Sequence, residues 1–462
     1  MSTQKNVSEQ QLQTQFTYID AVARLNGGKC PKAYTHTFGC QQNEADTERI
    51  RGMLHEMGYE MTDSTEEADF ILFNTCAVRE HAEDRAFGNI GALSHLKKKR
   101  PDVVIALCGC MAQRDGEKLL ADTDARLILG TARRAEIVTL LEQAQREHTR
   151  LCAVTDVRRA AFEPLLITHQ EGRTRATLKI QEGCDRFCTY CIIPYVRGGI
   201  RSRSVQDVRD EAARLEQAGY REIVLTGIHL TSYGRDLKNG DTLLSVIRAV
   251  HDIAGVERIR LGSLEPVIAT ADFARALGEM PKLCPQFHLA LQSGCDSVLR
   301  RMRRRYDTAA FRESAQALRA VFPDCALTTD VMSGFPGETD AEHRQSLDFC
   351  REMRFARMHV FPYSEREGTA AATMPDPVPR HIREERAREL IALGAGMAED
   401  YRRAQLGTVR RVLFEQCAEG VSVGYTPEYM RCETLGTVCG QTLPVRMTGL
   451  LPEGFSGEIV TD

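Results

Sequence analysis

Short apolar segments alternate with amphipathic segments over most of the 462 residues, and this alternation restricts the fold more than any other feature. Between residues 32 and 109, strand-like KAYTHTFG, DFILFNT and VVIALCG are separated by the helical patterns NEADTERIRGMLHEMG and EDRAFGNIGALSHLKKK. Strands separated by helices pair in parallel, since the chain must cross back before each new strand. Residues 30–150 are therefore predicted to form a parallel α/β sheet domain, with a closing helix around RRAEIVTLLEQAQREH.

A second strand–helix series begins at RATLKIQ and continues through EIVLTGI, RIRLGSL, FHLALQSG, ALTTDVMSG and ARMHVFPYS. A complete eight-stranded barrel needs about 250 residues, so the six repeats here predict a partial (β/α)6 barrel. The barrel is assigned to residues 174–402, including a charged exit helix from about Arg380. Short strands around Gly and Pro in residues 403–462 predict a small β-barrel. Residues 1–29 are predicted to be a polar tail and residues 151–173 a connector.

Composition excludes several classes of protein. The chain is 42% hydrophobic and 27% charged, with a formal net charge of −4, so any contact with nucleic acid must use local patches. The polar start MSTQKNVSEQQLQTQ lacks the apolar core of a signal peptide, and no apolar run approaches the length of a membrane span. The expected location is the cytoplasm, without membrane contact. The 16 cysteines then predict reduced thiols for metal or redox chemistry rather than disulfides.

Three cysteines in QEGCDRFCTYCIIPY follow the first barrel strand directly, where barrel active sites are built: Cys184, Cys188 and Cys191. A structural zinc site is the alternative, but it needs four ligands, and no fourth Cys or His stands beside these three. A four-iron cluster held by three thiolates leaves one iron open to a further ligand. The spacing therefore favours an iron–sulfur site.

A second set of thiols is dispersed along the first domain. Cys40, Cys76 and Cys110 each come at the end of a predicted strand. Residues just past the ends of parallel strands converge on one edge of the sheet. Each cysteine alone would be a buried small hydrophobe, whereas the shared placement of the three favours a second metal site. Cys108 points to the opposite side of its strand and is assigned to the core.

The motifs TFGCQQNEADTE, NTCAVREHAEDRAFG, CGCMAQR, IQEGCDRFCTYCIIPYVRG, LTGIHLTSYG, LQSG, TTDVMSGFPGET and HVFPYS resemble the radical SAM tRNA methylthiotransferase family over residues 32–462. The resemblance implies an N-terminal methylthiotransferase domain, a radical SAM barrel and a C-terminal TRAM domain that binds RNA. It implies two [4Fe-4S] clusters, one on each set of three cysteines, with S-adenosylmethionine (SAM) bound to the open iron of the barrel cluster.

The activity implied by the resemblance is that of a sulfur-group transferase. One SAM methylates a sulfur at the first cluster, and a second yields the radical that removes hydrogen from carbon 2 of an adenine, which then receives the methylthio group. The implied partners are the anticodon stem-loop of tRNA and a reductant such as flavodoxin or ferredoxin. No catalytic residue beyond the cluster cysteines is assigned.

Candidate contacts for SAM lie in the barrel motifs, although each one alone is equally well explained as structural. The candidates are Thr226 and Gly227 in LTGI, Ser263 and Glu265 in LGSLEP, Gln292 in LQSG, and Asp330, Phe361 and Tyr363. Basic runs near the barrel (Arg197, Arg201 and Arg203; Arg300 to Arg305) are candidate RNA contacts or plain solvated faces. Residues 402–462 contain six Arg and seven acidic residues, so the C-terminal domain is not a basic module.

The substrate adenosine is the least determined feature. The N-terminal motifs resemble the isopentenyladenosine (MiaB-type) branch, whereas the barrel and C-terminal motifs resemble the threonylcarbamoyladenosine (MtaB-type) branch. Because the base must meet the radical at the barrel, the sequence predicts N6-threonylcarbamoyladenosine next to the anticodon. The alternatives are isopentenyladenosine in tRNA, an aspartate of a ribosomal protein, and a non-enzymatic iron–sulfur or zinc protein that binds RNA.

Overall fold

The computed structural model describes residues 17–22, 24, 26, 29–39, 41–77, 80–160, 162–163 and 174–460. Cys40, most of the predicted tail and part of the predicted connector lie outside these residues. The chain divides into two compact units. Unit 1 comprises Met1–Glu171, Glu182–Asp185 and Cys191–Ser202, and unit 2 comprises Gly172–Gln181, Arg186–Tyr190 and Arg203–Asp462. No helix in the described ranges is long and apolar enough to cross a membrane.

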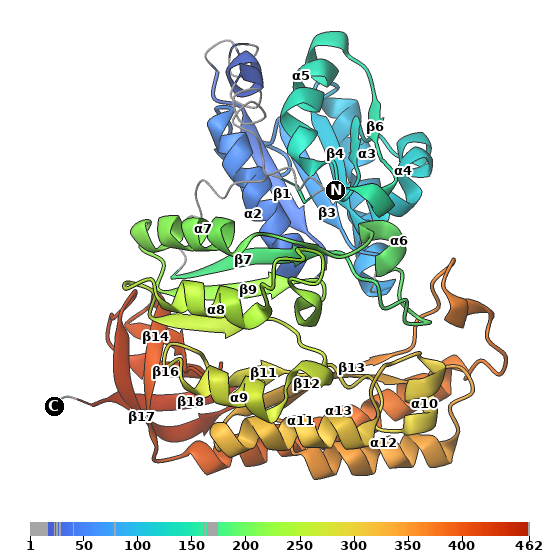
Figure 1. Ribbon diagram of the computed structural model, residues 1–462. Coiled ribbons are helices and arrows are strands. Elements are labelled where there is room, and N and C mark those ends of the chain that lie inside the picture. Colours follow the sequence, from blue (N-terminus) through green and yellow to red (C-terminus); the bar gives the residue numbers. More distant parts are fainter. Residues whose placement is uncertain are drawn as a thin grey trace. The chain divides into compact units, whose positions relative to one another are not determined.

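Unit 1 contains a six-stranded parallel sheet in the order β2-β1-β3-β4-β5-β6, which confirms the predicted α/β domain (Figure 1). Its strands are β1 (Lys32–Thr37), β2 (Glu60–Met61), β3 (Phe70–Thr75), β4 (Val104–Gly109), β5 (Leu127–Leu129) and β6 (Leu151–Ala153). Its helices are α2 (Gln41–Glu56), α3 (Glu80–Lys99), α4 (Cys110–Asp122), α5 (Ile137–Glu147) and α6 (Ile193–Arg197), with short η1 (Arg134–Glu136), η2 (Val157–Arg159) and β8 (Arg201–Ser202).

Both faces of this sheet are buried, because successive strand residues enter different cores. Phe70 and Leu72 of β3 belong to one hydrophobic cluster, whereas Ile71 and Phe73 belong to the other. Strands covered on both faces are typical of parallel sheets flanked by helices. Cys108 of β4 is fully buried in the first cluster, as the sequence predicted. The strand ends are thereby held in register at one edge.

Unit 2 begins with six parallel strands in chain order, which confirms the partial barrel. β7 (Arg175–Glu182), β9 (Glu222–Gly227) and β10 (Arg258–Leu261) pair in the order β10-β9-β7. β11 (Gln286–His288), β12 (Ala326–Ser333) and β13 (Arg357–Pro362) form a second sheet. Two isolated parallel bridges, Ile259 to Leu283 and Leu264 to Leu289, connect the two sheets beside β10 and β11.

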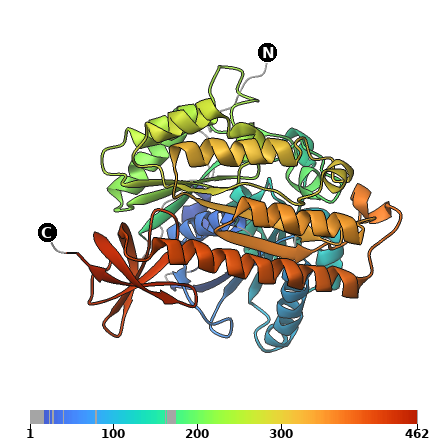
Figure 2. The ribbon, with the colours of Figure 1, turned by 90° about the horizontal axis from the view of Figure 1, so that it is seen from below.

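Helices cover the outer face of the barrel strands. They are α7 (Val205–Gln217), α8 (Leu243–His251), α9 (Ala271–Gly278), α10 (Asp296–Arg301), α11 (Thr308–Val321), α12 (Asp340–Met353) and the exit helix α13 (Arg380–Gln405), with short η3 (Leu230–Ser232), η4 (Pro266–Ile268) and η5 (Ala370–Thr373). Figures 1 and 2 show α11, α12 and α13 side by side over one face of the β11–β13 sheet. The opposite face of that sheet is left for polar side chains.

The C-terminal part of unit 2 is a closed barrel in the order β14-β15-β16-β18-β17, as predicted for a TRAM-like domain. Its strands are β14 (Val409–Ala418), β15 (Val421–Tyr425), β16 (Arg431–Leu435), β17 (Thr442–Leu451) and β18 (Gly454–Ile459). Buried arginines of β10 bind this barrel: Arg258 donates to the carbonyl of Tyr425 at 2.9 Å, and Arg260 to that of Pro427 at 2.9 Å. Glu222 of β9 balances both charges, at 2.8 Å from Arg260 Nε and 3.7 Å from Arg258 Nη1.

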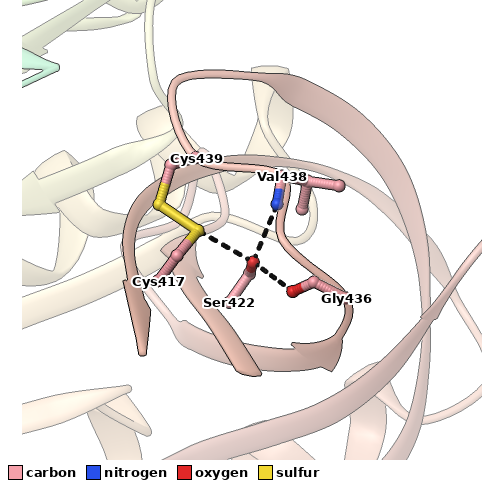
Figure 3. The surroundings of a disulfide bond; sticks show 5 residues. All are labelled: Cys417, Ser422, Gly436, Val438 and Cys439. Carbon is pink, nitrogen blue, oxygen red and sulfur yellow. Dashed lines mark hydrogen bonds between the residues drawn. A yellow bond between two sulfur atoms is a disulfide. The ribbon is translucent and has the colours of Figure 1, made fainter. Parts of the chain in front are cut away.

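The prediction that the cysteines are reduced is wrong for one pair. Cys417, near the end of β14, forms a disulfide with Cys439, in the turn before β17, with their Cα atoms 5.8 Å apart (Figure 3). The neighbouring Ser422 hydroxyl accepts a hydrogen bond from Val438 N at 3.0 Å and donates to the Gly436 carbonyl at 2.7 Å. Closure of the β-barrel brings the two cysteines within bridging distance, although 22 positions separate them in sequence.

Candidate functional site

The strand register of unit 1 gathers the dispersed thiols at one edge of the sheet. Thr75 of β3 pairs with Gly109 of β4, so Cys76 and Cys110 each follow directly after paired positions of neighbouring strands. Cys40 is outside the described residues, but its neighbour Gly39 is close to Cys76. A Cβ atom on Gly39 would lie 2.8 Å from Cys76 Cβ and 3.1 Å from Cys76 Sγ. The predicted convergence therefore holds for the two described cysteines and for the residue that precedes the third.

A buried asparagine fixes these strand ends. Asn43 of α2 donates through Nδ2 to the carbonyls of Phe38, at 3.1 Å, and Thr75, at 3.0 Å. Its own carbonyl accepts from Asn74 Nδ2 at 2.8 Å. A buried amide that satisfies carbonyls of two strands resists their separation, because breaking either bond leaves a buried polar group unpaired. Asn43 thus holds together the segments that precede Cys40 and Cys76.

Two segments of the cysteine-containing barrel loop, Glu182–Asp185 and Cys191–Ser202, belong to unit 1. Cys184 N donates to the Gly198 carbonyl at 3.0 Å, and Thr131 Oγ1 donates to the carbonyl of Val196. An apolar cluster consists of the buried Ala77, Cys110, Ile192 and Val196 with the half-buried Ile193. Within unit 1, the segment that begins at Cys191 therefore packs directly against Cys110.

Arg197 of α6 is a functional candidate that sequence reasoning missed. It was grouped with surface basic residues, yet only 1% of its side chain is exposed. Its guanidinium donates to Cys110 Sγ at 3.2 Å, Asn43 Oδ1 at 2.6 Å, Glu182 Oε1 at 2.9 Å and, at the longer distance of 3.5 Å, Asp46 Oδ2. The only signal in the sequence was its position six residues after Cys191.

A second buried arginine, which contacts carboxylates and the Thr131 carbonyl, completes this charge network. Arg134 of η1 forms ion pairs with Asp46 and with Glu163 Oε2, the latter at 2.6 Å, and is fully buried. Glu182 lies 3.6 Å from Arg134 as well. Burial alone would lower the pKa of Arg134, but Asp46 and Glu163 outweigh it and raise that pKa. Carboxylates thus compensate both buried guanidinium charges.

In unit 2, a corresponding arginine binds the remaining thiol of the loop. Arg304 donates to Cys188 Sγ at 3.2 Å and to Tyr306 Oη at 2.9 Å, and it lies 3.2 Å from Glu265 Oε1. Arg304 also belonged to a predicted surface basic run, and that assignment is wrong because its side chain is buried. The partners that bury it, Glu265 and Cys188, are distant in sequence.

The Glu265 carboxylate has three side-chain partners: Arg186, His229 and Arg304. Arg186 Nη2 lies 2.8 Å and His229 Nε2 3.1 Å from its carboxylate, in addition to Arg304. Burial alone would raise the pKa of Glu265, but the hydrogen bond from His229 and the charges of Arg304 and Arg186 lower it to about 2. Glu265 is therefore ionised at neutral pH, and its carboxylate already has three partners within the protein.

The predicted SAM contacts lie at or just beyond the carboxyl ends of consecutive barrel strands, except Asp330, which lies within its strand. Thr226 and Gly227 end β9, Ser263 and Glu265 follow β10, Gln292 follows β11, Asp330 lies in β12, Phe361 lies in β13 and Tyr363 follows it. Gly227 is required by packing, since a Cβ there would lie 2.9 Å from Gln181 Cβ. The structure shows that these residues come from neighbouring barrel strands; their contact with SAM remains a proposal.

Two of these residues have features that packing does not explain. Gln292 has a positive φ of 69° while its backbone pairs with Asp330 O and Met332 N, at 2.8 Å each. Strained backbone at a non-glycine residue often marks a functional site. The Tyr363 hydroxyl is buried and, among the described residues, has no hydrogen-bond partner. A bound ligand would satisfy this hydroxyl.

Comparison with known proteins identifies the family. Residues 32–130 match the family described as "Uncharacterized protein family UPF0004", and residues 178–350 match the Radical SAM superfamily. The tRNA-2-methylthio-N(6)-dimethylallyladenosine synthase of Acetivibrio thermocellus is 36% identical over 470 residues, covering 98% of this chain and 97% of the relative. The threonylcarbamoyladenosine tRNA methylthiotransferase MtaB of Bacillus subtilis is 36% identical over 408 residues, covering 87% and 90%.

This chain belongs to the radical SAM tRNA methylthiotransferase family. A solved structure of the radical S-adenosylmethionine methyltransferase TsrM from Kitasatospora setae, with cobalamin and a [4Fe-4S] cluster bound, has a TM-score of 0.55. Each chain is 74% covered at 13% identity, so this likeness shows the fold alone. The methylthiotransferase is a radical SAM enzyme, and membership of that superfamily implies a [4Fe-4S] cluster and SAM.

The residues of this methylthiotransferase fit such a cluster. In the described part of the chain, no three His, Cys, Asp or Glu side chains are gathered as ligands of a single metal ion. A four-iron cluster differs from a single ion, because its own sulfides bridge the irons and its thiolates stand apart. The loop supplies three thiols within eight residues, and Arg304 directs an N–H group at one of the sulfurs. Such donors commonly support ligated thiolates.

Proposed function

We propose that this methylthiotransferase converts N6-threonylcarbamoyladenosine next to the anticodon of tRNA into its 2-methylthio derivative, using two iron–sulfur clusters. The observation that carries the proposal is the placement of both thiol sets. Unit 1 contains Cys76 and Cys110 at neighbouring strand ends, and it also contains the segments that bear Cys184 and Cys191. Thiols of both sets within one compact unit suit a reaction in which a sulfur group must meet an activated base.

The two clusters would be held by Cys40, Cys76 and Cys110 and by Cys184, Cys188 and Cys191. When bound, they would supply a methylated sulfur and, with SAM, the radical that activates carbon 2 of the base. The protein's own residues position these sites: Arg304 holds Cys188, Arg197 holds Cys110, and Asn43 holds the strand ends. The apolar cluster around Cys110 excludes water from the sulfur.

The open face of β13 supports the threonylcarbamoyl substrate. Arg357, His359 and Phe361 alternate on this face and are exposed, with Phe361 37% exposed. Neighbouring side chains on one strand face stand about 6.6 Å apart, so the row spans about 13 Å. That length accommodates an adenine and its N6 substituent. Phe361 offers a stacking surface for a base, and Arg357 offers a forked donor suited to the threonyl carboxylate.

The second candidate substrate is the dimethylallyl (isopentenyl) adenosine of tRNA. The relative from Acetivibrio thermocellus, matched over nearly the whole chain, has a name that states this specificity. Its N6 substituent is apolar and carries no charge to pair with Arg357. The proposal also takes the anticodon stem-loop as the bound part of tRNA, a flavodoxin or ferredoxin as electron donor, and the cytoplasm as location.

A side-by-side turnover tests the proposal. Anaerobically reconstituted enzyme is incubated with tRNA carrying either threonylcarbamoyladenosine or isopentenyladenosine, and the nucleosides are analysed by mass spectrometry. We expect 2-methylthio product from the first tRNA and almost none from the second, because a site built for a charged group rejects an analogue that leaves it unpaired by orders of magnitude. Equal or greater product from isopentenyl tRNA would overturn the substrate assignment.

A variant sharpens this test. Arg357→Gln should lower turnover of threonylcarbamoyl tRNA by about 10- to 100-fold, the loss typical of one charged hydrogen-bonded contact. Its cleavage of SAM without tRNA should stay at the wild-type rate. The matched control is Arg354→Gln, an exposed arginine at the end of α12, which should leave both rates unchanged. Unchanged turnover in Arg357→Gln would remove β13 from substrate recognition.

A further inference from the structure

Arg197 connects groups from three different elements. Its guanidinium reaches Cys110 just after β4, Asn43 of α2, and Glu182 at the end of β7. Asn43 in turn binds the carbonyls of Phe38 and Thr75, and Glu182 comes two residues before Cys184. Its own backbone belongs to the segment that starts at Cys191.

We propose that Arg197 is a positioning residue that fixes Cys110, a thiol of the proposed sulfur-carrying site, against the segment that begins at Cys191 within unit 1. This inference rests on the proposed function, since it assigns a cluster to the dispersed set. Arg197 touches no substrate; it acts through Cys110 and through the strand ends that Asn43 holds.

The chemistry of the contact supports this role. Arg197 Nε donates to Cys110 Sγ while its two terminal nitrogens are held by Asn43 and Glu182, so the fork has one orientation. An N–H group directed at a cluster thiolate stabilises the more negative, reduced state and so raises the reduction potential. The remaining positive charge is compensated by Glu182 and Asp46, at 2.9 and 3.5 Å. The arginine thus affects both the place and the potential of the sulfur site.

Arg134 provides a matched control within the same network. It is as buried as Arg197 and pairs with the same Asp46, but its side chain donates to carboxylates and to the Thr131 carbonyl. Replacing either arginine by Lys keeps one positive charge and removes the fork. If any change to a buried arginine lowers product formation, both Lys variants will show the loss. If the proposed role is right, only Arg197→Lys will show it.

The experiment measures three quantities in anaerobically reconstituted full-length enzyme: iron content, SAM cleavage, and methylthio product formed per SAM cleaved. We expect Arg197→Lys to retain about eight irons, as two four-iron clusters. Its SAM cleavage should stay near wild type, while its product per SAM cleaved falls about tenfold or more, as for other outer-shell partners of metal ligands.

A potential measurement supplies a readout that a merely structural role would not move. Redox titration followed by electron paramagnetic resonance, in a background without Cys184, Cys188 and Cys191, should show a more negative potential in Arg197→Lys and no shift in Arg134→Lys. An unchanged potential and unchanged product ratio in Arg197→Lys would overturn the proposal. So would equal changes in Arg134→Lys, or loss of iron from both variants.

Failure of the proposed function would appear differently. In that case the wild-type enzyme would form no methylthio product on either tRNA, or the background without the barrel cysteines would contain no iron. Where that background binds iron, the potential shift tests Arg197 whatever the substrate is.

Discussion

Gly109 shows how a single residue sets the geometry of the sulfur site. It has a φ of 97°, and a Cβ atom there would lie 2.2 Å from the Thr75 carbonyl oxygen. This close approach of β4 to β3 places Cys110 at the first position of α4, beside Cys76. Only glycine combines this positive φ with so little space. The geometry of the dispersed thiols therefore depends on a residue that ligates nothing.

Gly109→Ala should lower the free energy of unfolding of the apoenzyme by about 3 kcal/mol, from backbone strain and the clash with Thr75. It should also remove about four of about eight irons, because Cys110 moves. Urea unfolding and iron analysis measure these effects. The control is Gly88→Ala in α3, where a Cβ meets nothing within 4 Å and Ala should be neutral or stabilising by up to about 1 kcal/mol. A full complement of iron in Gly109→Ala would contradict this account.

At the scale of elements, a buried ion-pair group fastens the C-terminal barrel to β9 and β10. Arg258 and Arg260 bind carbonyls of the β-barrel, and Arg260 also lies over the ring of Tyr429 at 4.6 Å. Burial alone would raise the pKa of Glu222, but Arg260 and Arg258 outweigh it and lower that pKa. The carboxylate therefore stays ionised and keeps both arginines oriented toward the barrel.

Glu222→Gln should lower the free energy of unfolding at pH 7 by about 3 kcal/mol, since it leaves two buried arginines undercompensated. Because the folded-state pKa of Glu222 lies below its ordinary value, this contribution is complete above about pH 4.5 and is lost as the pH falls toward the folded value. The difference in Tm between the variant and the wild type should thus be constant from pH 6 to 8 and shrink in acid.

The control for Glu222 is Glu257→Gln, whose carboxylate lies 4.0 Å from the exposed Arg221. An exposed pair contributes at most about 1 kcal/mol, so this variant should unfold almost as the wild type does. A Tm difference for Glu222→Gln that grows on acidification would reverse the expected sign and refute the assignment.

The disulfide gives a second prediction at this scale. Cys439→Ser apoenzyme should unfold its C-terminal barrel with a free energy lower by about 2–4 kcal/mol than the oxidised wild type, the usual contribution of a native cross-link. In excess dithiothreitol the two proteins should unfold alike, because both then lack the bond. A difference that persists in dithiothreitol would assign the effect to side-chain packing instead. Iron content should be unaffected by the substitution.

Features set by local sequence patterns could be predicted from the sequence, whereas features set by contacts between distant residues could not. Strand–helix alternation and the cysteine positions at strand ends are local patterns, and they predicted the parallel sheets of both units and the convergence of Cys76 and Cys110. The burial of Arg197 and Arg304 depends on partners far away in sequence, so a basic run gave no sign of it. The disulfide likewise depends on closure of the β-barrel. Helix α4 was missed because it starts at Cys110, directly after the strand.

At the scale of the whole molecule, the two cysteine sets do not each occupy a unit of their own. Unit 1 holds Cys76, Cys110, Cys184 and Cys191, whereas Cys188 belongs to unit 2 with the predicted SAM contacts. Sequence segments of the barrel loop are thus part of the compact body that presents the dispersed thiols. Unit 1 thus contains thiols of both sets, although neither set lies in it completely among the described residues.

The most direct test of separate roles for the two cysteine sets is a measurement on the Cys40→Ala, Cys76→Ala, Cys110→Ala triple variant, with SAM cleavage and methylthio product quantified together. The account predicts about four irons instead of about eight, cleavage of SAM to 5′-deoxyadenosine at close to the wild-type rate, and no methylthio product. The variant without Cys184, Cys188 and Cys191 should also keep about four irons but cleave no SAM. A folded first variant that retains all its iron, forms methylthio product, or has lost SAM cleavage would contradict the account.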